Sequence, residues 1–156
     1  MEAPNTTRTG SVGSAAAGPG RVTRPEAGTA ARGLTAFAVA LSASVHLALW
    51  SIGYGTGTPI RPAFLANAIG GLALGLVVLL WRHWLPLLAA VGFAGATLGA
   101  FILSITVGLF GEDPGTASGT PQLLAASAEV AIVVFAVLTF VSERQVIRLR
   151  RQASTT

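Results

Sequence analysis

The chain has 156 residues, of which 52% are hydrophobic and only 10% are charged, and its mean hydropathy is +0.68. This composition excludes an ordinary water-soluble domain, in which about a quarter of the residues are charged. The absence of cysteine excludes disulfides and thiolate metal sites. The net charge of +4 comes from arginines that lie beside apolar segments, which favours a membrane surface over nucleic acid as the partner.

Residues 1–32 are rich in Gly, Pro, Ala, Thr and Ser and have no apolar periodicity. Such a segment cannot bury enough surface to offset the entropy of ordering it, so we predict a disordered N-terminal tail. The first apolar run is of full membrane length, and no shorter apolar core of a signal peptide precedes it. We therefore expect no cleavage.

Four apolar stretches follow, and each is close to the 20 residues or so that a helix needs to cross a bilayer. Gly- and Pro-rich loops separate the first from the second and the third from the fourth, while a tight turn at 82–85 joins the second to the third. The fold prediction is an all-α membrane protein with four transmembrane helices in an up-down antiparallel bundle over residues 33–142. The predicted spans are 34–53, 63–81, 86–110 and 121–141.

Residues 143–156 are predicted to form a basic tail. Its first part interleaves apolar residues with arginines, so it should continue the fourth helix out of the membrane as far as Gln152, close to anionic head groups.

The arginines predict the orientation, because short cytoplasmic segments retain positive charge during insertion. Nine fall on one side of the four spans, and only Arg61 falls on the other. Aromatic residues of the kind that anchor helices at an interface agree, with Trp50 and Tyr54 at one boundary and Trp81 and Trp84 at the opposite one. We predict cytoplasmic termini in a multi-pass protein of the bacterial plasma membrane, in contact with lipid. The nine arginines are Arg8, Arg21, Arg24, Arg32, Arg82, Arg144, Arg148, Arg150 and Arg151.

Two GxxxG motifs lie in the middle spans, Gly71 with Gly75 and Gly95 with Gly99. Small residues at this spacing let two helix backbones approach closely. The simpler interpretation is that both pairs pack the hairpin of the second and third helices internally. The alternative is that one pair binds a second copy of the chain or another membrane protein.

The two titratable side chains inside the predicted spans are His46 and Glu129. From the rise of 1.5 Å per residue, His46 lies about 10 Å and Glu129 about 12 Å from the outer boundary. Asn67 and Ser104 lie about 6 Å and 9 Å from it by the same arithmetic. Each helix therefore contributes one polar group to a layer in the outer half of the membrane.

This layer has two interpretations. In the structural one, His46 and Glu129 touch directly, through Asn67 or through one water, and Ser104 completes a hydrogen-bond network that fixes helix order. In the functional one, the layer is a shallow site that binds a proton, a metal or a small ligand, because ionisable residues within membranes are often functional. Metal is the weaker version, since one histidine and one carboxylate are too few ligands.

No catalytic residues are predicted, because the chain has no Walker loop, no HExxH motif, no carboxylate pair at one depth and no nucleophile beside a base. No cofactor is predicted either. His83 falls at the opposite boundary from His46, so the two cannot ligate one haem.

The segments SASVHLALW, FLANAIGGLALGLVVLL, TVGLFG and AASAEVAIVV carry a resemblance over roughly residues 34–141. In these the chain resembles a family of small four-helix membrane proteins common in actinobacteria. The resemblance implies the four-span layout and a histidine and a glutamate at these places. It implies no substrate, cofactor or reaction.

These observations lead to two functional hypotheses. The first is a non-enzymatic accessory or assembly component that docks a partner through its small-residue faces. The second is a small transporter or sensor with a proton- or ligand-linked site at His46 and Glu129. Transporters commonly contain internal repeats with broken helices, and the first two spans do not recur as the last two, which ranks transport below the accessory role.

Overall fold

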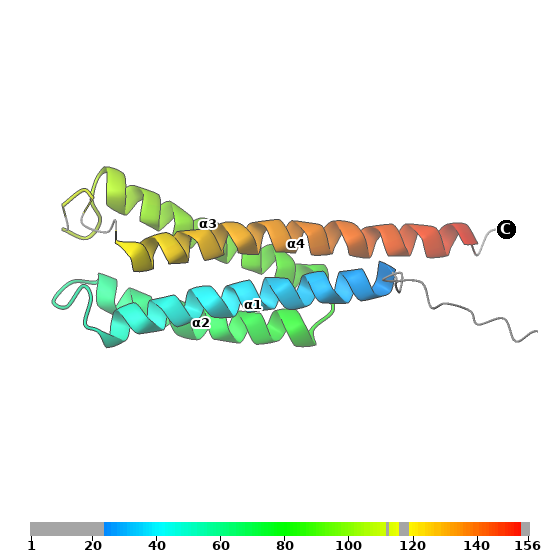
Figure 1. Ribbon diagram of the computed structural model, residues 1–156, viewed down its shortest axis with the longest axis horizontal. Helices are drawn as coiled ribbons and strands as arrows, with labels where there is room; N and C mark the ends of the chain where they lie inside the picture. The colour runs from blue at the N-terminus through cyan, green and yellow to red at the C-terminus, as the bar shows by residue number, and fades with distance from the viewer. Residues whose placement is uncertain (1–23, 112, 116–118, 154–156) are drawn as a thin grey trace, which may run out of the picture.

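The computed structural model describes residues 24–111, 113–115 and 119–153. These residues form four helices, α1 (Arg24–Ser51), α2 (Ile60–Leu80), α3 (Trp84–Thr106) and α4 (Thr120–Ala153). Successive helices run in opposite directions, and both ends of the described chain lie at the same end of the bundle (Figure 1). We call this the terminal end, and we call the opposite end, which carries loop 52–59 and the described residues between α3 and α4 (107–111, 113–115 and 119), the loop end.

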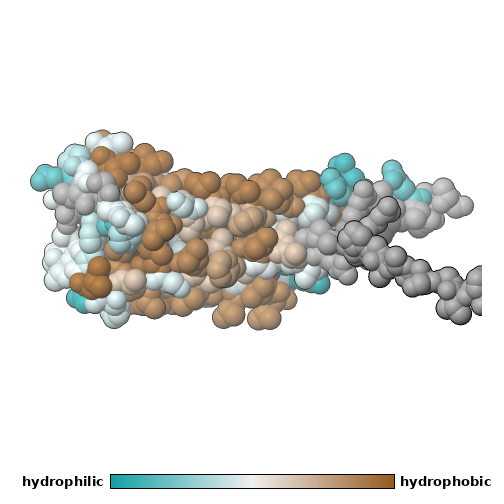
Figure 2. All heavy atoms as spheres, viewed as in Figure 1, coloured by the Kyte–Doolittle hydropathy of each residue, from teal (hydrophilic) through white to brown (hydrophobic). Residues whose placement is uncertain are grey.

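All four helices contain a stretch long and apolar enough to cross a bilayer, namely Gly28–Ser51, Ile60–Leu80, Trp84–Thr106 and Thr120–Arg148. Large apolar side chains cover the visible flank of the bundle between two more polar ends (Figure 2). Exposed apolar surface of this extent is unfavourable in water and is expected against lipid tails. The chain is therefore a multi-pass integral membrane protein built as a four-helix bundle.

The helices differ from the predicted spans mainly at their ends. α1 begins at Arg24, so the predicted tail boundary at residue 32 lies inside a helix, and the rest of that tail, residues 1–23, lies outside the described residues. The helix can begin this early because Pro25 suits the first turn of a helix and Ala27, Ala30 and Ala31 have high helix propensity. α3 ends at Thr106, four residues earlier than predicted, where Gly108 takes a positive φ of 80°. α4 continues to Ala153, so the helix does extend through the segment for which a helical continuation was predicted, and its position outside the membrane stays a prediction.

Packing is tightest in the terminal half of the bundle. Helix α1 lies between α2 and α4 and packs along both, α3 packs mainly on α4, and α2 and α3 touch each other least. The fully or almost fully buried apolar side chains gather where all four helices meet, and they are mostly small, which lets the backbones approach closely. They include Ala36, Val39, Val78, Leu87, Ala90, Ala94, Ile132 and Ala136.

The two GxxxG motifs lie in different surroundings. The prediction was that both pack the α2–α3 hairpin internally, and the structure differs from it. An added Cβ at Gly71 would lie 3.0 Å from the Cβ of Ala43 on α1 and 3.2 Å from Phe93 on α3, as the hairpin packing predicts in part, and Gly75 faces the carbonyl of Ala36 on α1. By contrast, a Cβ at Gly95 or Gly99 would meet nothing within 4 Å. The α2 motif therefore packs inside the bundle against α1, while the α3 motif faces outward.

Candidate functional site

Polar side chains follow the seam between α1 and α4. Thr35 and Thr139 are both fully buried, and their hydroxyl oxygens lie 3.2 Å apart. Two to three turns nearer the loop end, Glu129 is also fully buried, and its Oε1 accepts a hydrogen bond of 2.5 Å from the hydroxyl of Ser42. Glu129 Oε2 has no hydrogen-bond partner in the described part of the chain.

His46 lies one turn beyond Ser42 on α1 and is 4% exposed. Its Nδ1 is 2.8 Å from the carbonyl oxygen of Ser42 and 3.5 Å from the Ser42 hydroxyl. A carbonyl can only accept, so Nδ1 carries the proton and the Nε2 of a neutral ring is left as an acceptor. The ring packs edge-on against Phe64 of α2, with centroids 5.6 Å apart.

The structure thus brings His46 and Glu129 to one level and joins them through Ser42. The predicted links were a direct contact, Asn67 or a water, and no hydrogen bond among the described residues connects the pair directly or through Asn67. The sequence does contain a signal for Ser42, because it lies four residues before His46 and seven after Thr35, on one helix face. It was missed because serine is common in membrane helices, where its hydroxyl usually bonds to its own helix.

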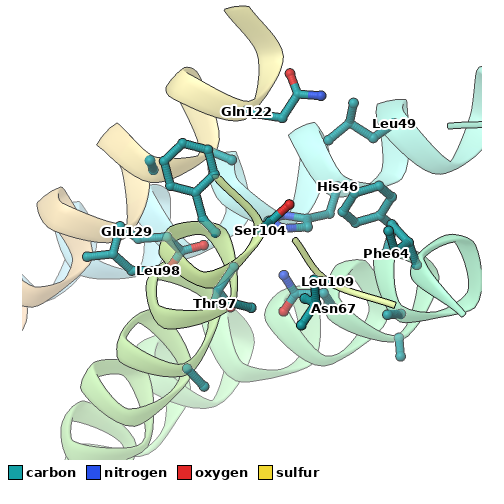
Figure 3. Close-up of a pocket in the computed structure, with 18 of the residues that line it drawn as sticks. His46, Leu49, Phe64, Asn67, Thr97, Leu98, Ser104, Leu109, Gln122 and Glu129 are labelled. Carbon is teal, nitrogen blue, oxygen red and sulfur yellow. The ribbon is translucent and has the colours of Figure 1, made fainter. Parts of the chain in front are cut away.

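A cavity of about 490 Å³ occupies the loop half of the bundle beside this cluster. Its walls come from all four helices and from loop residues Tyr54, Leu109 and Phe110. Most wall atoms are apolar, and the polar side chains His46, Asn67, Thr97, Ser104, Gln122 and Glu129 are set among them (Figure 3).

Asn67 and Ser104 line this cavity, but neither side chain makes a hydrogen bond within the described part of the chain. The predicted network through them is therefore not formed. The physical reason is that α2 and α3 stand apart in this half, which leaves space between their polar groups and the α1–α4 seam (Figure 3). The amide of Asn67 and the hydroxyl of Ser104 therefore remain available to a ligand.

The cavity reaches the surface between α2 and α3. Four alanines line it and are also exposed, Ala63 and Ala66 on α2 and Ala96 and Ala100 on α3. Their small side chains leave a gap where larger residues would close it. Since the flanks of the bundle face lipid, this opening connects the cavity with the hydrocarbon layer.

A second polar cluster closes the terminal end. Arg32, 3% exposed, donates to the carbonyl oxygens of Val78, Trp81 and His83 and to both carboxylate oxygens of Glu143, at 2.9–3.1 Å. The last carbonyls of a helix have no partner in the helix itself, so one guanidinium completes the end of α2 and ties it to α1 and α4. Arg32 was expected only to set topology, and its buried role was not predicted.

The cavity offers groups that can recognise a ligand. No group of three or more His, Cys, Asp or Glu side chains that could hold a metal is found among the described residues. What it holds is one carboxyl group with an unpaired oxygen, one imidazole with an available nitrogen, and apolar walls. A site of this kind, concave and mostly apolar with a few convergent polar groups, is typical of small-molecule binding.

Comparisons with protein-family models, with curated proteins and with solved structures found no match. The resemblance to the actinobacterial four-helix proteins therefore rests on the sequence segments alone.

Proposed function

We propose that this protein binds an apolar small molecule that reaches it from the bilayer. The observation that carries the proposal is the cavity of about 490 Å³, which opens between α2 and α3 and contains a fully buried carboxyl group with an unpaired oxygen. Its volume lies within the range of about 300–1,000 Å³ that is common for ligand sites. An unpaired buried polar group costs about 1–3 kcal/mol, and a ligand that pairs with it recovers this energy.

The bundle is divided in a way that suits this role. The terminal half is closely packed and held by the Arg32 cluster, whereas the loop half is open. A bound ligand would bridge α2 and α3 where they do not touch, so its presence could be transmitted to a partner as a change in helix separation. The function is then that of a membrane sensor or binding component, and the loop end would face outward according to the arginine distribution.

Filling the cavity tests the proposal. Ala96→Leu places a larger side chain at the opening, while Ala89→Leu makes the same change on the same face of α3, outside the cavity. Saturable binding of a radiolabelled apolar probe such as phenylbutanol is measured in lipid nanodiscs against empty nanodiscs. We expect Ala96→Leu to abolish the saturable part and Ala89→Leu to preserve it. Equal binding by both variants, or no saturable binding by the natural chain, would contradict the proposal.

A second candidate function is that of an accessory subunit. It is favoured by one face of α3, on which Gly92, Gly95 and Gly99 have open space where a Cβ would lie. This helix is also the least buried, at 11% of its most apolar window against 44% for α1. Gly95→Leu should then remove a membrane partner that co-purifies in mild detergent, and co-purification unaffected by this change would exclude the α3 face as the docking surface.

A further inference from the structure

We infer that the ligand of the cavity is a lipophilic amine, whose ammonium group binds at Glu129 while its apolar body lies between α2 and α3. This inference rests on the proposed binding function and specifies the chemistry of the ligand.

Two buried polar atoms at the cavity wall are acceptors without a donor, whereas the Asn67 amide and the Ser104 hydroxyl can both donate and accept. Glu129 Oε2 is buried and has no donor among the described residues, since the Ser42 hydroxyl is engaged with Oε1. His46 Nε2 is an acceptor in the neutral ring, because Nδ1 donates to the Ser42 carbonyl. A ligand that pairs with both acceptors, Glu129 Oε2 and His46 Nε2, needs several N–H donors, and an ammonium group carries them on one nitrogen.

Charge leads to the same ligand. Within the described chain the ion pair found joins Arg32 and Glu143, and Glu129 makes none. Arg32 binds Glu143 at the terminal end, and the guanidinium carbon of Arg61 lies 5.7 Å from the centroid of the Trp50 ring at the loop end. A carboxylate inside a membrane requires a compensating partner, so a cation supplied by the ligand fills a role that the described residues leave open.

The walls suit a cation with an apolar body. Phe64, Phe93 and Phe101 line the cavity, and aromatic faces attract ammonium groups when water is excluded. The alanines at the opening leave a passage for an alkyl or aryl chain.

Depth distinguishes a free amine from a lipid headgroup. Glu129 lies nine residues after the start of α4 at Thr120, about 13 Å along the helix axis. The amine of a phosphatidylethanolamine headgroup is held at the membrane boundary, far from this carboxyl group. A small amine dissolved in the hydrocarbon layer meets no such restriction.

The test compares two probes of nearly equal size and shape, phenylbutylamine and phenylbutanol, in phosphatidylcholine nanodiscs at about pH 8, where a primary amine is still protonated. We expect the full chain to bind the amine at least about tenfold more tightly than the alcohol. In Glu129→Gln, which keeps an acceptor for Ser42, the amine should lose this advantage, so that amine and alcohol bind with similar affinity. Asp113→Asn removes the same charge from the exposed loop end and should change neither affinity.

Ala96→Leu provides a second variant that leaves the carboxyl group intact, and it should weaken both probes. Equal affinity of the natural chain for amine and alcohol would overturn the inference and leave the binding function standing, whereas saturable binding of neither probe would overturn both. Retained preference for the amine in Glu129→Gln would place the cation elsewhere and overturn the inference. Competition with the amine when half of the lipid is phosphatidylethanolamine would show that a headgroup is the occupant and would overturn the assignment to a free amine.

Discussion

Ser42 decides how the residues of the candidate site are connected. Hydroxyl groups in these helices mostly return to a carbonyl of their own helix, as Ser44 does to Ala40 and Ser127 to Leu123. Ser42 instead donates across the helix interface to Glu129. Because both residues are buried, this bond helps to set the rotation of α1 against α4.

A double-mutant cycle tests this connection. Ser42→Ala leaves the carboxyl group of Glu129 without its donor, so we expect it to lower the free energy of unfolding by about 1–3 kcal/mol. Glu129→Ala combined with Ser42→Ala should cost less than the two single changes added together, by at least about 1 kcal/mol. Steric trapping in bilayers measures these energies.

The cycle between His46→Ala and Glu129→Ala serves as the control. His46 bonds to the carbonyl of Ser42 and not to Glu129, so its coupling to Glu129 should stay within about 0.5 kcal/mol. A larger coupling for His46 than for Ser42 would show that the histidine and the glutamate interact directly.

At the scale of the helices, two contacts hold the bundle, namely the Arg32 cluster at one end and the α1–α2 backbone approach at Gly71 and Gly75. Both contacts tie α2 to α1, and they reach α3 only at Phe93 and at His83, in the turn that precedes it. Helix α3 is therefore fixed mainly through α4 and is the helix most able to shift when the cavity is occupied.

Arg32→Lys should be strongly destabilising although it keeps the charge. An ammonium group cannot reproduce hydrogen bonds in the plane of a guanidinium to three carbonyls and a carboxylate, and breaking a buried ion pair costs about 3–5 kcal/mol. We expect a loss of at least about 2 kcal/mol in the free energy of unfolding. Arg82→Lys, at an exposed residue that donates to Thr29, is the matched control and should change stability by less than about 0.5 kcal/mol. Equal effects of the two changes would disprove the buried role of Arg32.

The two glycine motifs offer a second matched pair. Gly71→Ala puts a methyl group 3.0 Å from Ala43 and 3.2 Å from Phe93, so overpacking should destabilise the protein by about 1–3 kcal/mol. Gly95→Ala meets open space and should stabilise the helix by up to about 1 kcal/mol, because alanine has the higher helix propensity. Thermal unfolding in detergent ranks the two variants, and the reverse order would mean that the α3 motif is the buried one.

The sequence predicts the four helices well, since length and hydropathy alone decide whether a segment crosses a membrane. It also places His46 and Glu129 at one level, because depth follows from the rise per residue. It does not predict Ser42 or Arg32 as partners, since a hydroxyl near a glutamate and an arginine near a helix end each have a simpler interpretation. The sequence also does not show which face of a helix packs against a neighbour. The two GxxxG motifs have the same pattern, yet their surroundings in the structure differ.

At the scale of the whole molecule, the bundle has a closely packed half and an open half. This division could not be predicted, because the cavity arises from the divergence of α2 and α3, which no local pattern encodes. The sequence indicates only that polar groups concentrate in the half that turns out to be open.

Topology is the prediction that belongs to this scale. The natural chain has no cysteine, so single cysteines can be introduced without background. From the nine-to-one arginine distribution we expect Thr56→Cys in loop 52–59 to react with an impermeant maleimide added to intact cells. Gln145→Cys, in the arginine-rich C-terminal part of α4, should react only after the membrane is permeabilised. The opposite pattern would invert the assignment and place the cavity nearer the cytoplasm.

The Arg32 cluster has a consequence for biosynthesis. Its guanidinium emerges from the ribosome 111 residues ahead of Glu143, and 46 residues ahead of the first carbonyl that it will bind. Until the last helix is inserted, α1 carries a cation whose permanent partner does not exist. A nascent chain that stalls before α4 thus lacks Glu143 as the partner of Arg32, and this charge is paired only once α4 has been inserted.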